Sequence, residues 1–151
     1  MRTIIRPYQG FGPIDFGMSR PEVIARLGPP RRDDPNDREF VQYVDLGLQA
    51  NFRPGGGGCF WISSFPPCEP EVQGIPLDGV YSEVEYSLCR AGYLLHIGRG
   101  VIEGWLRCDE LGIQVTREDL DTQEIESVSA YTRNHYTDPD DDWVLLREPP
   151  S

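Results

Sequence analysis

The chain has 151 residues, of which 38% are hydrophobic and 26% are charged. This composition is typical of one globular domain with a real core, here residues 1–151, and excludes an intrinsically disordered chain. The formal net charge is −11. We expect this charge to disfavour nucleic acid and anionic membranes, whose phosphates would repel the protein, and to favour solubility or a basic protein partner.

The sequence carries no recognisable signal for export or for a membrane. Residues 1–8 lack the apolar run of a signal peptide, and no segment approaches the roughly 18 apolar residues of a membrane span. We therefore expect a cytoplasmic protein with reduced thiols. The four cysteines, Cys59, Cys68, Cys89 and Cys108, form no CxxC pair, so we expect neither a metal ion nor a cofactor.

Residues 17–30 have the pattern of a short helix with both ends marked. Ser19 can cap the first turn, and Glu22 can complete a capping box from three residues later. Gly28, followed by two prolines, suits the end of the helix. The apolar stripe consists of Val23, Ile24 and Leu27. A helix this short is unstable alone and must pack against the rest of the fold.

Three strands are expected after this helix and a charged loop at 31–38. The runs at 40–44 and 46–52 are β-like, with a tight turn at 45–47 between them. Residues 55–58 are four glycines and are predicted to form a flexible hairpin tip. A third strand at 60–65 is stopped by two prolines.

The second half contains a weaker copy of this order. Residues 83–88 match 22–27, residues 110–114 match 45–49, and residues 128–131 match 62–65, with offsets of 61 to 66 residues. We predict a helix at about 80–91 and strands at 93–97, 104–109, 111–116 and 125–132, with a further strand at 142–146. The first repeat spans about 11–67, the second spans about 75–132, and an acidic segment follows at 133–151.

These elements predict an α+β fold. Two tandem α-β-β-β(-β) repeats would form one antiparallel sheet, with two short helices packed on one of its faces. The other face would stay partly open, and an open face is where such a protein would bind a partner.

The motif Gly-Met-Ser/Thr-x-x-Glu-Val-x-x-x-Leu-Gly-x-Pro, followed by strands and present twice, resembles the tandem modules of β-lactamase-inhibitor-like proteins. Outer-membrane assembly lipoproteins of the SmpA type carry a single such unit. Residues 17–29 carry the motif, whereas the second copy has Gly79-Val80-Tyr81 in place of Gly-Met-Ser. In a small acidic chain this pattern is similar to immunity proteins encoded beside interbacterial toxins. The resemblance implies a sheet surface for protein binding and no catalytic residues.

Catalytic constellations are weak in this sequence. His96 alternates within an expected strand and is predicted to be a sheet residue with a satisfied ring, and His135 is predicted to lie in a surface turn. The glycines at 55–58 are not a phosphate loop, because such a loop needs a lysine and the chain has none. We therefore predict that the protein is not an enzyme.

Two acidic clusters are candidates for contact with a basic partner. One lies at 138–142, where a weak calcium site, a solvated loop and a docking patch all remain open. The other comprises Glu118, Asp119, Asp121, Glu124 and Glu126, in a loop before the last repeat strand. Together they would form one negative surface if they faced the same way.

The three tryptophans, Trp61, Trp105 and Trp143, lie in or beside expected strands. We expect at least two of them in the core, the commoner place for this side chain. Alternation along 104–109 places Trp105 on the face opposite Leu106 and Cys108. Trp105 is therefore the best candidate for an aromatic anchor on the open face.

The sequence thus favours a cytoplasmic immunity protein that binds a cognate toxin through a basic cleft and occludes its active site. A nuclease, a deaminase, an NAD-consuming enzyme and an ADP-ribosyltransferase are all compatible toxins. The predicted contact residues are Trp105, Glu118, Asp119, Asp121, Asp138, Asp140, Asp141 and Asp142. We expect a monomer. The alternatives are a small ligand-binding or enzymatic α+β domain with a pocket at the sheet face, and a module that assembles with itself through strand edges.

Overall fold

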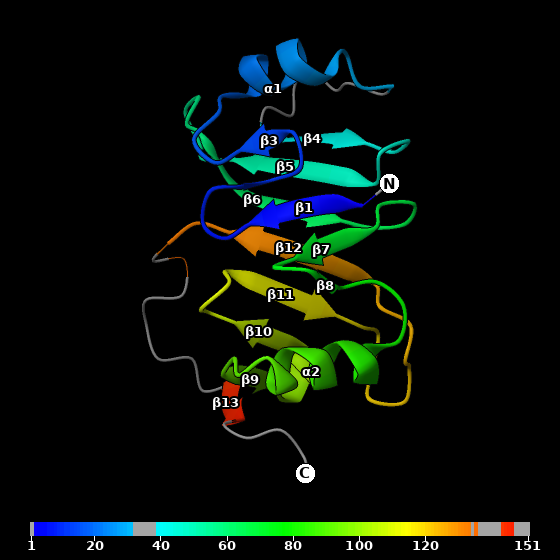
Figure 1. Cartoon of the computed structure of the whole chain (residues 1–151). Helices are drawn as coiled ribbons and strands as arrows, with labels where there is room; N and C mark the ends of the chain where they lie inside the picture. Colours follow the sequence, from blue (N-terminus) through cyan, green and yellow to red (C-terminus); the bar gives the residue numbers. More distant parts are fainter. Residues whose placement is uncertain (1, 32–38, 134, 136–142, 147–151) are drawn as a thin grey trace.

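A computed structural model describes residues 2–31, 39–133, 135 and 143–146. It confirms the α+β class, with two helices and two mostly antiparallel sheets (Figure 1). The large sheet contains, in spatial order, β13 (Trp143–Leu146), β9 (Leu95–Gly98), β10 (Leu106–Cys108), β11 (Ile113–Thr116), β12 (Ser127–Tyr131), β6 (Cys59–Ser64), β5 (Leu48–Phe52) and β4 (Phe40–Tyr43). All neighbouring strands in this sheet are antiparallel.

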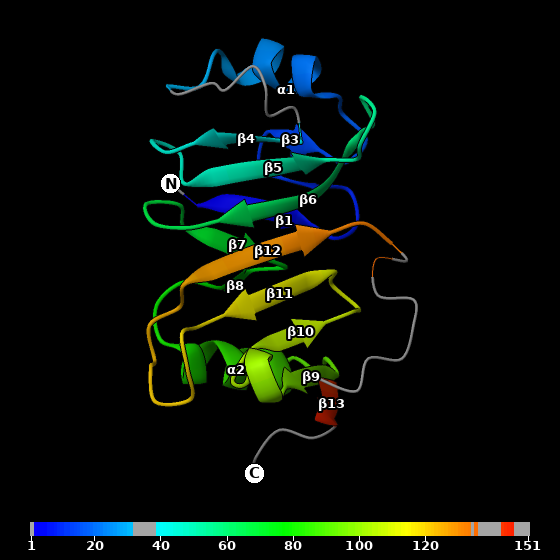
Figure 2. The same cartoon turned by 180° about the vertical axis from the view of Figure 1, so that it is seen from behind.

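The expectation of a single sheet is wrong, because a second sheet lies over the middle of the large one (Figures 1 and 2). It contains β3 (Ile14–Asp15), β2 (Gly10–Phe11), β1 (Thr3–Arg6), β7 (Pro70–Val72) and β8 (Ile75–Pro76). Only the pair β1 and β7 is parallel. These strands have two to four residues each, too short to show an alternating pattern in the sequence.

The two helices flank the small sheet. β3 leads into α1 (Arg20–Leu27) near β4, and β8 leads into α2 (Tyr81–Arg90) near β9 and β10 (Figure 1). The capping box of α1 is present as predicted, and the helix stops at Gly28. A short 3-10 helix, η1 (Gly100–Ile102), connects β9 to β10.

The core lies between the large sheet and the layer formed by the small sheet and the helices. β5 shows how alternation builds it, because Leu48, Ala50 and Phe52 are buried while the residues between them are half-exposed. The largest fully buried side chains are Tyr81, Tyr131, Phe11, Ile5, Ile14, Leu48, Ile62, Leu77, Leu88, Leu95, Leu106 and Ile113. Tyr131 lies on the opposite face of the large sheet, whereas the others come from both sheets, α2 and the segment before α2, so one core serves the whole described chain.

The opposite face of the large sheet carries a row of mainly polar residues, one per strand. The strand register places these residues side by side across the sheet. From β4 to β13 they are Gln42, Gln49, Ser63, Ser129, Gln114, Arg107, His96 and Leu145. Arg107 lies at 5.0 Å from the ring of Trp143, and Trp61 stacks on Tyr131 with ring centres 5.8 Å apart. This outer face is therefore partly covered by its own aromatic residues.

The expectation that at least two tryptophans lie in the core is wrong. Trp61, Trp105 and Trp143 are all half-buried. Trp61 lies two positions before Ser63, and Trp105 lies two positions before Arg107. Because Ser63 and Arg107 point outward, the alternation also directs the two tryptophans away from the core. The same alternation buries Leu106 and Cys108 completely, as predicted.

The strands assigned to the two expected repeats occupy the two halves of the large sheet. β4, β5 and β6 lie on one side of the central β6–β12 pair, and β10, β11 and β12 lie on the other in mirrored order. This arrangement agrees with the matched segments, but the tandem repeat itself stays a prediction. Neither helix in the described residues is long and apolar enough to cross a membrane.

Candidate binding groove at the acidic edge

Several loops that follow strand ends gather at one edge of the molecule. They are the loop from β6 to β7, the segment between β8 and α2, and residues 117–126, which we call the acidic loop (Figures 1 and 2). The acidic loop connects β11 to β12 and lies beside the start of α2 in both views. This edge carries one of the two acidic clusters that the sequence singled out.

Arg117 anchors the acidic loop to its surroundings. The side chain is 7% exposed, and its Nη1 donates to the carbonyls of Leu120 and Thr122 at 3.3 Å each. Its Nε donates to the Gly104 carbonyl at 2.9 Å. The guanidinium also lies 3.7 Å from the centre of the Tyr81 ring. One buried cation therefore joins the loop to the segment before β10 and to α2.

Asp119 shapes the tip of the acidic loop. Its Oδ1 accepts hydrogen bonds from the backbone N–H groups of Asp121 and Thr122 and from the Thr122 hydroxyl, at 2.8 to 2.9 Å. The Thr122 hydroxyl is the main cause that lowers the pKa of Asp119. The carboxylate is exposed, but these bonds show that it holds a turn as well as adding charge.

Gln123 joins the acidic loop to the N-terminus of α2. Its carbonyl accepts from Tyr81 N at 2.9 Å, and its side-chain Oε1 accepts from Ser82 N at 3.1 Å. Val80 and Glu124 form an isolated antiparallel bridge next to it. Val80 itself provides no side-chain cap, so Gln123 replaces the local cap that this helix lacks.

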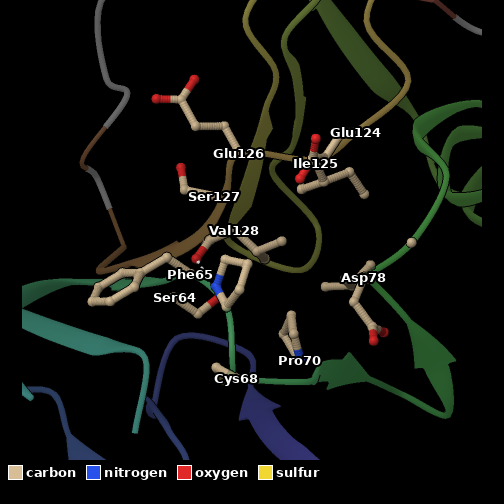
Figure 3. A pocket seen from close by; sticks show the side chains of 13 residues that line it. Ser64, Phe65, Cys68, Pro70, Asp78, Glu124, Ile125, Glu126, Ser127 and Val128 are labelled. Carbon is tan, nitrogen blue, oxygen red and sulfur yellow. Dashed lines mark hydrogen bonds between the residues drawn. The ribbon is translucent and has the colours of Figure 1, made fainter. Parts of the chain in front are cut away.

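A cavity of about 220 Å³ opens between the acidic loop and the loop that follows β6 (Figure 3). Its apolar lining comes from Phe65, Pro66, Pro70, Leu77, Ile125 and Val128. The charged residues in its lining are Asp78, Glu124 and Glu126, all of them acids. A second hollow of about 440 Å³ shares Pro66 and residues 124–126 with the first and adds Glu118 and Thr122. The two hollows therefore form one groove with an acidic rim.

The charges along this groove are largely uncompensated. Asp78 pairs with Arg2, whose Nε also lies 3.8 Å from Glu71. In contrast, the carboxylates of Glu118, Asp121, Glu124 and Glu126 are exposed and form no ion pair with any residue that the structure describes. An array of this kind attracts cations, because each added carboxylate raises the negative potential at the rim.

The structure brings together four of the predicted contact residues. Trp105 donates from Nε1 to the Arg117 carbonyl at 2.9 Å, which places the indole beside the acidic loop. Glu118, Asp119 and Asp121 belong to that loop. The other four, Asp138, Asp140, Asp141 and Asp142, lie outside the described residues.

The cavity and the place of Asp78 in its lining are not apparent from the sequence. The lining comes from four segments, around 64–66, 68–70, 77–79 and 124–128, and no local pattern connects them. Glu124 and Glu126 were recognised as part of an acidic cluster but not as lining a cavity. The small sheet brings these segments together, because it contains Pro70 and leads to Asp78.

The histidines lie away from this groove, because neither lines either hollow. His96 Nδ1 has no hydrogen-bond partner in the described chain, with Asp109 Oδ2 at 3.9 Å, so the expectation of a satisfied ring is wrong for this atom. Burial is the main cause that lowers the pKa of His96, followed by the charge of Arg107. His135 is exposed in a turn, as predicted, and lies 4.9 Å from the Trp61 ring.

Asp109 belongs to a hydrogen-bonded cluster on the outer face. Its carboxylate accepts from Arg107 Nη2 at 3.1 Å and from the Tyr131 hydroxyl at 2.8 Å. The cysteines are free thiols, and burial raises the pKa of Cys59 and of Cys108 to about 12. Thiols with such values are poor nucleophiles, because the thiolate is the reactive form. In the described chain, no group of three or more His, Cys, Asp or Glu residues is placed to hold a metal ion.

In comparisons with known proteins, no family model, no curated protein and no solved structure matches the chain.

Proposed function

We propose that the protein is a non-enzymatic immunity protein that binds a toxin through the acidic edge and blocks the toxin's active site. The observation that carries this proposal is the array of four exposed, unpaired carboxylates, Glu118, Asp121, Glu124 and Glu126, on a loop held in place by Arg117. Such an array is complementary to a basic substrate cleft, as found in enzymes that act on nucleic acids or nucleotides.

The mechanism would be occlusion. The carboxylates would occupy positions where the toxin binds phosphate groups, and Trp105, half-buried beside the loop, would provide an aromatic contact. A stable complex of this kind typically buries about 1,600 Å² in total. Because exposed charges dominate, association would be fast at low salt and would slow as salt is added. A nuclease, deaminase, NAD-consuming enzyme or ADP-ribosyltransferase would be inhibited in the cytoplasm, with one copy of the chain acting alone.

The test is co-expression of the chain with the product of the adjacent open reading frame, scored by growth of the host. The loop variant carries Glu118→Gln, Asp121→Asn, Glu124→Gln and Glu126→Gln, which leave Arg117, Asp119 and Gln123 in place. The control is Glu110→Gln, in the turn between β10 and β11 at the opposite edge, where the amide oxygen still accepts from Leu94 N.

We expect the unaltered chain and the control to protect the host and to purify in a complex that high salt releases. The loop variant should lose protection while its unfolding curve stays unchanged. A neighbouring gene product that is harmless and unbound would overturn the immunity role. Full protection by the loop variant would overturn the role of the acidic edge.

A second candidate, a small ligand-binding domain, is favoured by the cavity near Asp78. It would be supported if a metabolite screen raised the melting temperature of the unaltered chain and if that shift were lost in Glu124→Gln/Glu126→Gln. The immunity role predicts instead that protection of the host requires the whole acidic loop.

A further inference from the structure

The cavity of about 220 Å³ combines an apolar wall with an acidic rim. Phe65, Pro66 and Ile125 form part of the wall, and Glu124 and Glu126 stand at the rim with no basic residue in the lining (Figure 3). An occupant that suits both parts has an apolar stem and a positively charged end. Amphipathic side chains of this kind bury their stems along apolar surface and keep their charged ends at a polar boundary.

The volume of the cavity limits the size of its occupant. Pockets that bind whole small molecules usually measure about 300 to 1,000 Å³. At about 220 Å³ the first hollow of the groove lies below that range by itself, which suits one side chain, and the adjoining hollow measures about 440 Å³. The adjoining hollow, which shares Glu124 and Glu126 with the cavity, then has room for the neighbouring residues of a polypeptide.

The walls are already ordered by backbone hydrogen bonds. Cys68 N donates to Phe65 O at 2.9 Å, and Leu77 N donates to Pro70 O at 2.9 Å. On the other side, Glu126 N donates to Thr116 O at 2.8 Å. A cavity fixed in this way loses little conformational entropy when it is filled, so a single side chain can contribute measurably to affinity.

The charges of the rim favour a guanidinium over an ammonium group. Arg2 already pairs with Asp78, which leaves Glu124 and Glu126 as the carboxylates available to an incoming cation. Glu124 and Glu126 direct their carboxylates apart at the rim (Figure 3), so a guanidinium, which donates several hydrogen bonds at fixed angles, can reach either of them. The guanidinium is also more weakly hydrated than the lysine ammonium and loses less on entering a partly apolar site.

We propose that this cavity binds one arginine side chain of the partner protein, with the stem against Phe65, Pro66 and Ile125 and the guanidinium on Glu124 and Glu126. This assignment rests on the proposed function, because it names the anchor residue of the same interface. In this assignment the cavity determines which residue of the partner is recognised. The remaining carboxylates of the interface act mainly through long-range attraction.

The experiment is an NMR titration of the full chain with the blocked amino acid Nα-acetyl-arginine methylamide. The matched probes are the lysine analogue and the citrulline analogue, which has the shape of arginine without its charge. The variants are Glu124→Gln/Glu126→Gln at the cavity and Glu103→Gln/Glu110→Gln, a control that removes equal charge at two exposed residues that line neither hollow.

We expect the arginine probe to shift the amide signals of residues 64–66, 77–79 and 124–128, with an affinity at least tenfold above that of the citrulline probe. The cavity variant should weaken arginine binding at least tenfold, whereas the control at Glu103 and Glu110 should change it less than twofold. Equal binding of arginine and citrulline, or shifts spread over the surface, would overturn the assignment.

The outcome for the cavity is separate from the outcome for the immunity role. Arginine binding without any toxin partner would support the cavity assignment and contradict the proposed function. A partner that binds the cavity variant as tightly as the unaltered chain would overturn the arginine anchor and leave the proposed function standing.

Discussion

The two helices satisfy their first backbone N–H groups in different ways. In α1, the Ser19 hydroxyl accepts from Glu22 N and the Glu22 carboxylate accepts from Ser19 N, at 3.3 Å each. In α2, the acceptor for Ser82 N is the side chain of Gln123, which lies 41 residues further along the chain. The start of α1 is therefore a local structure, whereas the start of α2 exists only together with the acidic loop.

α2, the helix without a local cap, is also the more deeply buried of the two. α1 has eight residues, of which only Val23 is buried, whereas α2 has ten residues, of which four are buried. Packing thus holds α2 where its own sequence offers no cap, and most helical stability in proteins comes from such packing. Because Gln123 and Arg117 both contact the first turn of α2, any change in the acidic loop reaches the helix as well.

The largest expected effect comes from removing the cation that joins α2 to the acidic loop. Arg117→Met should lower the free energy of unfolding by roughly 3 kcal/mol, because the carbonyls of Gly104, Leu120 and Thr122 lose a charged donor and the Tyr81 ring loses its cation. Urea unfolding measures this change. Hydrogen exchange should also show faster exchange at the Tyr81 and Ser82 amides.

Arg90→Met provides the control for that experiment. Arg90 is exposed near the end of α2 and donates to the Tyr86 hydroxyl, so its loss should change stability by no more than about 0.5 kcal/mol. Equal losses for Arg117→Met and Arg90→Met would show that the buried cation does not hold the loop against the helix.

The same contrast explains which parts of the fold the sequence could predict. Ser19, Glu22 and Gly28 lie within ten residues of one another, so their pattern alone fixed both ends of α1. The strands of the large sheet were placed to within a few residues, because alternation and turn residues are also local. α2 was placed from its apolar spacing, but its capping residue, Gln123, could not be found locally.

Features built from distant segments were missed for a physical reason. The small sheet pairs β1 with β7, whose partners Thr3 and Pro70 are 67 positions apart in the sequence. Strands so short carry no periodic signal, and only the packed structure shows that they cover the core. The cavity could not be predicted for the same reason, since Pro70 and Asp78 reach its lining only because β7 and β8 pair there.

The next effect compares the two caps directly. Ser19→Ala should lower stability by about 1 kcal/mol, since it removes a side-chain acceptor from the first turn of α1. Gln123→Ala should have an effect of the same order or smaller on α2, whose Tyr81 N keeps its bond to the backbone of residue 123. Urea unfolding would measure both changes.

The two cap variants differ in how far their effects spread. Gln123→Ala should also speed hydrogen exchange within the acidic loop and weaken binding of the arginine probe, whereas Ser19→Ala should change neither. Gln123→Glu keeps an acceptor for Ser82 N and should restore the protection of the loop. If Gln123→Ala left the acidic loop unchanged, the coupling between this loop and α2 would be disproved.

The smallest effect concerns a carboxyl group on α2 that faces the core side of the helix. Burial raises the pKa of Glu85 above its ordinary value of 4.5, and the nearby charge of Arg117 opposes this change. The folded protein therefore binds this proton more tightly than the unfolded chain, so stability falls as pH rises through the interval between the two pKa values. At neutral pH the ionised carboxylate destabilises the folded state.

Glu85→Gln should consequently raise stability at pH 7, and the gain should disappear below about pH 4, where the carboxyl group is protonated in both states. Urea unfolding between pH 3.5 and about pH 7.5 measures the difference. Glu83→Gln, at an exposed position in the first turn of α2, should give no gain at pH 7, because its charge interacts favourably with the helix dipole. A gain for Glu85→Gln that stayed constant across this range would mean that burial of the charge is not its cause.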